Sequence, residues 1–179
     1  MNRRRVVIVG KALLLFVVAV LLQTLLVSRI SVLGVTADLF LILTVVAGIG
    51  WGSMQGAIFG FFAGLIADTA YFQPLGVRAL IYVLGGYFVG MFVVRFGTVG
   101  PWAVLILAGG SSFLSQFVFG LFEYVTGPRA GFITMVGTQM IPGAVLDALV
   151  AVPVYILLVR LRVIPTPRVE KAMARSVPE

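Results

Sequence analysis

Long apolar segments with few charges follow one another along most of this 179-residue chain, and they restrict it to folds that lipid can surround. The stretch between Asp38 and Asp68 holds 29 uncharged residues, and the stretch between Arg78 and Arg95 holds 16. Charged residues make up 11% of the chain, whereas soluble domains carry about 25%. Because so few charges could not cover an apolar core in water, the sequence predicts an all-α, polytopic membrane protein.

Segment lengths and turn residues together predict six transmembrane helices. A helix needs about 20 apolar residues to cross a hydrocarbon core of about 30 Å. Segment 38–70 is too long for one crossing and too short for two full ones, and its middle, GIGWGSMQG, has turn chemistry. We therefore expect two short helices there, tilted or partly re-entrant. The predicted spans are 6–27, 38–51, 54–70, 79–94, 102–124 and 143–161.

Proline residues complicate the last apolar segment, 132–159, which is longer than one crossing requires. Pro142 is expected to divide it into an interfacial lead-in and the final span. Pro153 is expected to kink that span.

The 13 Lys and Arg residues cluster at the two ends of the chain, against 6 Asp and Glu residues. Cytoplasmic flanks of membrane spans are rich in Lys and Arg. With six spans, ten of these cations lie on the cytoplasmic side, and both termini are cytoplasmic. Residues 1–162 would then form the transmembrane domain and residues 163–179 a basic cytoplasmic tail. Nucleic-acid binding, which needs a basic face on a folded domain, is not expected.

The chain contains neither Cys nor His. This absence excludes thiolate nucleophiles, histidine bases and the usual zinc ligand sets. The serines lack a nucleophile-elbow setting, and no phosphate-binding glycine motif is present. We expect no enzyme activity, no cofactor and no metal.

Glycines recur at every fourth position from Gly48 to Gly64, which gives GxxxGxxxG over Gly56, Gly60 and Gly64. Small residues at this spacing allow two helix backbones to approach closely. Gly86 and Gly90 indicate similar packing on the next segment. Packing inside the bundle is the favoured interpretation, and a subunit interface, including a homodimer, is the alternative.

Four acids lie inside or at the ends of apolar segments: Asp38, Asp68, Glu123 and Asp147. Charges in lipid are costly and therefore usually functional or paired. Asp38 follows GVTA and is expected to cap a helix, while Asp68 is expected to form an ion pair with Arg78 near the outer face. Glu123 lies similarly at the end of its span, and Asp147 is the acid expected to be most buried. Proton or ion coupling is the alternative role.

A polar stripe on the fifth predicted span contains Ser111, Ser112, Ser115 and Gln116. Polar side chains of this kind hydrogen-bond neighbouring helices in membranes. A solute-binding patch is the alternative interpretation.

Residues 37–90 resemble the bacterial rod-shape-determining MreD family. The family pattern has a Pro-Asp-Leu opening, glycines at every fourth position, G-F-x-x-G-L-x-x-D, and then x-P-x-G. This chain matches it at Asp38-Leu39 (with Ala37 in place of Pro), Gly60-Phe61, Gly64-Leu65, Asp68, Pro74 and Gly76. The stretch 141–161 is also similar to the family's last helix, through Pro142 and Pro153.

The resemblance implies a non-enzymatic scaffold of the rod elongation complex in the bacterial cytoplasmic (inner) membrane, surrounded by membrane lipids. Its implied partner is the bitopic protein MreC, and through MreC it would connect to MreB, RodA and a penicillin-binding transpeptidase of peptidoglycan synthesis. Glycine-lined grooves would accept a helix, and the outer acids and Arg78 would fix its register.

The family is also similar to the six-helix S-components of vitamin transporters of the energy-coupling-factor type, so the fold expected is an S-component-like bundle. This likeness gives the alternative function, a solute-binding transporter subunit. Its cavity would be lined by Ser111, Ser115, Gln116 and Tyr82. The segment 12–22 lacks the Ala-x-x-x-Ala face that S-components use for docking, which favours the scaffold.

Overall fold

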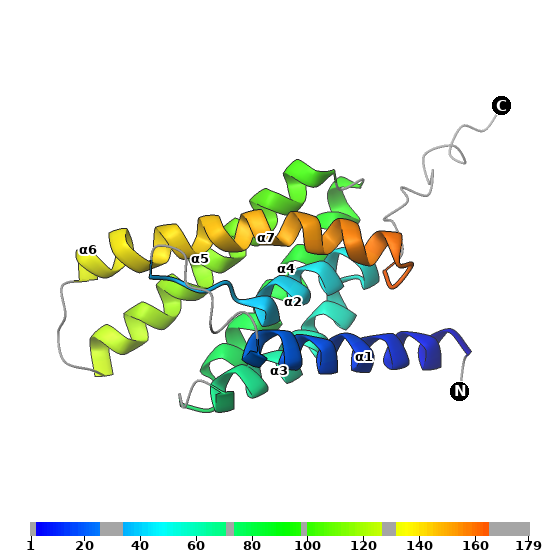
Figure 1. Ribbon diagram of the computed structural model, residues 1–179, viewed down its shortest axis with the longest axis horizontal. Helices are drawn as coiled ribbons and strands as arrows, with labels where there is room; N and C mark the ends of the chain where they lie inside the picture. The colour runs from blue at the N-terminus through cyan, green and yellow to red at the C-terminus, as the bar shows by residue number, and fades with distance from the viewer. Residues whose placement is uncertain (1–2, 26–33, 71–73, 98–99, 127–131, 165–179) are drawn as a thin grey trace.

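The computed structural model describes residues 3–25, 34–70, 74–97, 100–126 and 132–164. The elements of this part of the chain are helices, so the all-α prediction is confirmed there (Figure 1). Their bounds lie within a few residues of the predicted segments. They are α1 (Arg3–Leu25), α2 (Leu39–Trp51), α3 (Ser53–Ala70), α4 (Val77–Phe96), α5 (Pro101–Thr126), α6 (Phe132–Met135), the π-helix η2 (Val136–Met140) and α7 (Ile141–Arg160).

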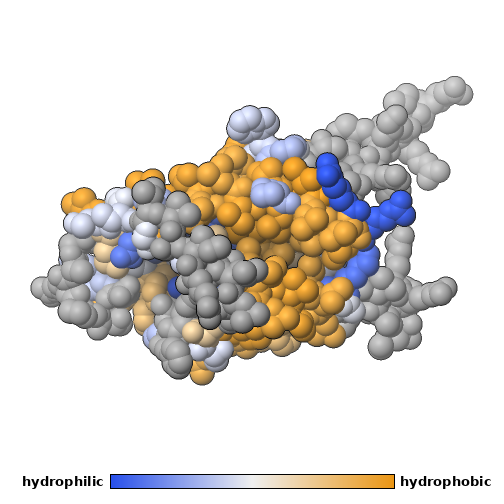
Figure 2. All heavy atoms as spheres, viewed as in Figure 1, coloured by the Kyte–Doolittle hydropathy of each residue, from blue (hydrophilic) through white to orange (hydrophobic). Residues whose placement is uncertain are grey.

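Three helical stretches of the described residues are long and apolar enough to cross a membrane: Val77–Phe96, Pro101–Phe122 and Ile133–Arg160. The start of α1 and the end of α7 lie at the same end of the bundle (Figure 1). There the Lys11 Nζ donates a hydrogen bond to the Arg162 carbonyl at 2.5 Å. The apolar surface forms a broad band along the molecule, and hydrophilic residues gather toward its two ends (Figure 2).

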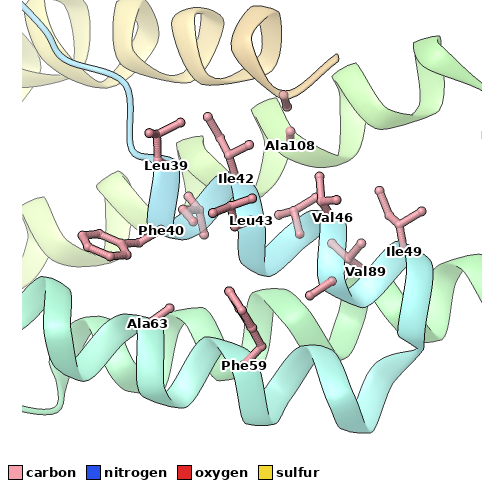
Figure 3. Close-up of a cluster of buried hydrophobic side chains, with 14 of the residues drawn as sticks. Leu39, Phe40, Ile42, Leu43, Val46, Ile49, Phe59, Ala63, Val89 and Ala108 are labelled. Carbon is pink, nitrogen blue, oxygen red and sulfur yellow. The ribbon is translucent and has the colours of Figure 1, made fainter. Parts of the chain in front are cut away.

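Helix α2 is the central helix of the bundle. Every residue from Leu39 to Ile49 is buried, and the helix contacts α1, α3, α4, α5 and α7. Figure 3 shows its side chains pointing to several sides, with Phe59 and Ala63 of α3 facing them. A helix that is hydrophobic all round belongs inside a bundle. Because protein surrounds α2, its 13 residues need not span the bilayer core on their own.

A single residue, Gly52, separates α2 from α3. Its φ of +95° is a backbone conformation that residues with a side chain rarely adopt. The Gly52 N–H donates to the Gly48 carbonyl at 3.0 Å, which ends α2. This tight turn within GIGWGSMQG allows segment 38–70 to hold two helices.

Helices α3 and α4 cross at backbone contact. A Cβ atom built on Gly60 would lie 2.4 Å from the Tyr82 carbonyl oxygen, and one on Gly64 would lie 2.3 Å from the Ala79 Cα. Such distances exclude any side chain larger than hydrogen without separation of the helices. Backbone atoms come equally close, within 2.4 to 2.6 Å, to a Cβ built on Gly56, Gly86 or Gly90.

Pro142 does not divide the last apolar segment, which corrects the prediction of a separate lead-in. Helix α6, the π-helix η2 and α7 follow one another without a break from Phe132 to Arg160. A proline has no N–H to donate, and its ring collides with the carbonyl four residues earlier. The preceding turn widens instead, and the Ile141 N–H donates to the Val136 carbonyl five residues back.

Candidate functional site

Asp38 is the centre of a polar cluster at the point where α2 begins. Its Oδ1 accepts the Leu41 N–H at 3.2 Å, which confirms the predicted helix cap. Its Oδ2 accepts hydrogen bonds from the Arg78 guanidinium at 3.2 Å and from the Tyr82 hydroxyl. The guanidinium also lies 4.9 Å from the centre of the Phe119 ring on α5. Asp38 and Arg78 therefore connect α2, α4 and α5.

Asp147 extends this cluster to α7. Its Oδ1 accepts the backbone N–H of Asp38 at 2.8 Å, and its Oδ2 accepts the Ser112 hydroxyl at 2.5 Å. The Gln116 side-chain amide donates in turn to the Ser112 oxygen at 2.9 Å. Asp147 is 2% exposed in the bundle. Two residues of the predicted polar stripe therefore form hydrogen bonds. Ser112 bonds to Asp147 on the neighbouring helix α7, and Gln116 bonds to Ser112 on the same helix.

Asp68 does not form the expected ion pair with Arg78. Its carboxylate accepts two backbone N–H groups, from Gly76 at 2.7 Å and from Arg78 at 3.2 Å. The Arg78 guanidinium pairs with Asp38 instead. Gly76 has a φ of +99°, and the fully buried Asp68 thus holds the left-handed turn that opens α4.

Gln23 is a member of the site that the sequence interpretation left without a role. Its amide nitrogen donates to the Ala37 carbonyl at 3.1 Å, and its amide oxygen accepts the Leu39 N–H at 3.0 Å. The signal available in the sequence was a lone amide within an apolar segment, because such a group needs hydrogen-bond partners when it is buried. Gln23 ties the end of α1 to the start of α2.

A polar cavity of about 380 Å³ opens beside this cluster. Its walls come from 34–36, the starts of α2 and α4, one face of α5, and the helix from α6 to α7. Ser115 and Gln116 line it, as the transporter alternative expected, but Ser111 and Tyr82 are not among its lining residues. Within the described residues, no group of three or more His, Cys, Asp or Glu could hold a metal ion.

A second hollow, an apolar groove of about 390 Å³, lies between α4 and α5. Gly85 and Gly110 line it from opposite helices, with Ser111 beside Gly110. A Cβ built on Gly110 would meet nothing within 4 Å, and one on Gly85 would just touch the Leu41 side chain at 4.0 Å. Gly85 and Gly110 thus leave space, unlike the glycines of the α3–α4 crossing.

The remaining predicted site residues are the five glycines of the helix crossings and Glu123. Gly56, Gly60, Gly64, Gly86 and Gly90 all contact backbone within this chain. The side chain of Glu123 lies outside the described part of the structure, as does Arg129.

Comparison with protein families identifies the chain. The family model described as "rod shape-determining protein MreD" matches residues 4–162. This chain belongs to the MreD family. Searches of curated proteins and of solved structures found no match.

Membership in the MreD family gives the chain a role in rod shape determination, within a family of shape-determining membrane proteins. The matched range includes the polar cluster, the cavity and the α4–α5 groove. The vitamin-transporter alternative gains no support from the family match.

Proposed function

We propose that this MreD family protein is a non-enzymatic scaffold of the bacterial inner membrane that binds MreC and so supports peptidoglycan synthesis during elongation. Contact with MreB, RodA and a penicillin-binding transpeptidase would be indirect, through MreC. We also propose six crossings with both termini in the cytoplasm. The shared end of α1 and α7, with Lys11 bonded to Arg162, supports this orientation because cations favour the cytoplasmic side.

The observation that carries the proposal is the groove between α4 and α5. MreC is expected to enter the membrane as one helix, and a helix packs best where small residues let its backbone approach. The glycines at 56, 60 and 64 are already in contact with α2 and α4. Gly85 and Gly110 are open, and large apolar side chains such as Leu84, Phe88 and Leu114 flank them. We therefore place the MreC helix in this groove.

Replacing Gly110 with leucine is expected to lower recovery of MreC about tenfold, which corresponds to a loss of roughly 1.4 kcal/mol in binding. The leucine side chain would fill the space that the partner backbone needs. The measurement is co-purification of MreC with the tagged protein from co-expressing membranes.

Gly10→Leu is the matched control because Gly10 is also a helical glycine with nothing within 4 Å, on α1. It should leave MreC recovery unchanged. Equal recovery of MreC with Gly110→Leu and Gly10→Leu would show that MreC does not bind in this groove. MreC that is solubilised without this protein at every stoichiometry tried would refute the scaffold itself.

A further inference from the structure

The polar cavity lies at the level where α1 and α3 end and α2 and α4 begin, while α5 and the helix from α6 to α7 extend further. Hydrogen bonds of Gln23, Asp38 and Asp68 join the end of α1, the start of α2, the end of α3 and the start of α4 at one level. Helix α5 continues from Gln116 to Thr126, about 15 Å further at 1.5 Å per residue. Figure 1 shows the end of α5 and α6 extending beyond the other helices. The cavity therefore lies at the end of the bundle from which α5 and α6 project, and the exposed α5 side chains beyond it, such as Leu121 and Val125, are still apolar.

Acidic side chains outnumber cationic ones in the described lining of the cavity. Its described lining has two carboxylates, Asp38 and Asp147, and one guanidinium, Arg78. The Ser112 hydroxyl accepts a hydrogen bond from the Gln116 amide and donates one to Asp147. A cation bound beside Asp147 would favour the ionised form of its carboxyl group. With both carboxylates ionised, one negative charge is left over beside the ion pair of Asp38 and Arg78.

A zwitterion with an ammonium group matches this arrangement. Ammonium carries three N–H donors for carboxylate oxygens, and guanidinium is well suited to phosphate. The cavity volume falls within the usual range of about 300–1,000 Å³ for small-ligand sites. Phe119, Met135 and Met140 supply an apolar part of the wall, suited to the glycerol and first methylenes of a lipid.

We propose that this cavity binds a phosphoethanolamine headgroup, with its ammonium toward Asp38 and Asp147 and its phosphate toward Arg78. The exposed apolar side chains of α5 beyond the cavity favour a bilayer lipid as the source over a free solute. The described linings of the cavity and of the α4–α5 groove share only Ser115, so ligand binding in the cavity does not require MreC in the groove.

The test is lipid retention by the purified full-length protein in detergent, measured by native mass spectrometry. Phosphatidylethanolamine, phosphatidylcholine and phosphatidylglycerol are supplied in equal amounts. Phosphatidylethanolamine is expected to be retained about tenfold over the other two, since charge-assisted hydrogen bonds discriminate on this scale and choline offers no N–H. Equal retention of the three lipids by the wild-type protein would overturn the proposal without any variant.

Asp147→Asn removes one charge and keeps an oxygen for the Asp38 N–H. It is expected to abolish the preference for phosphatidylethanolamine, while Ser111→Ala, whose side chain lines the other groove, keeps it. A preference that survives Asp147→Asn would overturn the assignment of the ammonium to this carboxylate. A separate experiment adds soluble phosphoethanolamine to the purified protein. If this compound displaces the retained lipid, the two bind at the same site. If it stabilises the protein while the three lipids are retained equally, a free solute replaces the lipid as ligand.

Discussion

Alanine at position 64 is expected to destabilise the folded bundle by more than about 3 kcal/mol, although the change adds one methyl group. Overpacking typically costs about 1–3 kcal/mol when neighbouring side chains can move. At Gly64 the neighbours are backbone atoms, the Ala79 Cα at 2.3 Å and the Ala79 nitrogen at 2.5 Å from the added Cβ. Relief requires α3 and α4 to separate, and this crossing is the most extensive helix contact in the described structure. Thermal unfolding in detergent, followed by loss of monodisperse protein, measures the effect.

Gly10→Ala provides the control for Gly64→Ala. Gly10 has nothing within 4 Å, and alanine favours a helix over glycine by about 1 kcal/mol, so this variant should be neutral or slightly more stable. A Gly64→Ala protein as stable as Gly10→Ala would show that the α3–α4 crossing is looser than described. The same contrast separates packing from partner binding, because neither position lies in the α4–α5 groove.

The helices of this protein could be predicted because their limits depend on local sequence. Apolar length and the cost of charge in lipid locate α4 between Arg78 and Arg95, and the glycine-rich turn at Gly52 divides α2 from α3. The prediction for Pro142 was wrong since a proline can either end a helix or widen its preceding turn. Which outcome occurs depends on packing around η2, and a linear sequence does not contain that information.

The partners within the polar cluster could not be predicted for a related reason. Asp68 and Arg78 are ten residues apart, so an ion pair between them was a natural expectation. The acid that the Arg78 guanidinium meets, Asp38, is 40 residues away, and Asp38 in turn meets Asp147 at a separation of 109 residues. These contacts depend on how α2, α4 and α7 pack, while the sequence indicates only that each charge needs a partner.

Arg78→Met is expected to destabilise the protein by about 2–3 kcal/mol, and by more than Asp38→Asn does. Breaking a buried ion pair costs about 3–5 kcal/mol, and an exposed pair is worth about 0–1 kcal/mol. The side chains of Arg78 and Asp38 are 19% and 16% exposed, so an intermediate value is expected.

The asymmetry between the two variants follows from the second carboxylate. Without Arg78, the carboxyl groups of Asp38 and Asp147 line the same cavity with no described cation in that lining to balance them. Without the Asp38 charge, Asp147 still has Arg78 nearby, and asparagine still caps α2. The free energy of unfolding of each variant and of the double variant gives the coupling between the two sites. The double variant is expected to be more stable than Arg78→Met alone, because removing the Asp38 charge relieves the repulsion. Additive losses would show that Arg78 acts through its packing on Phe119 and not through charge.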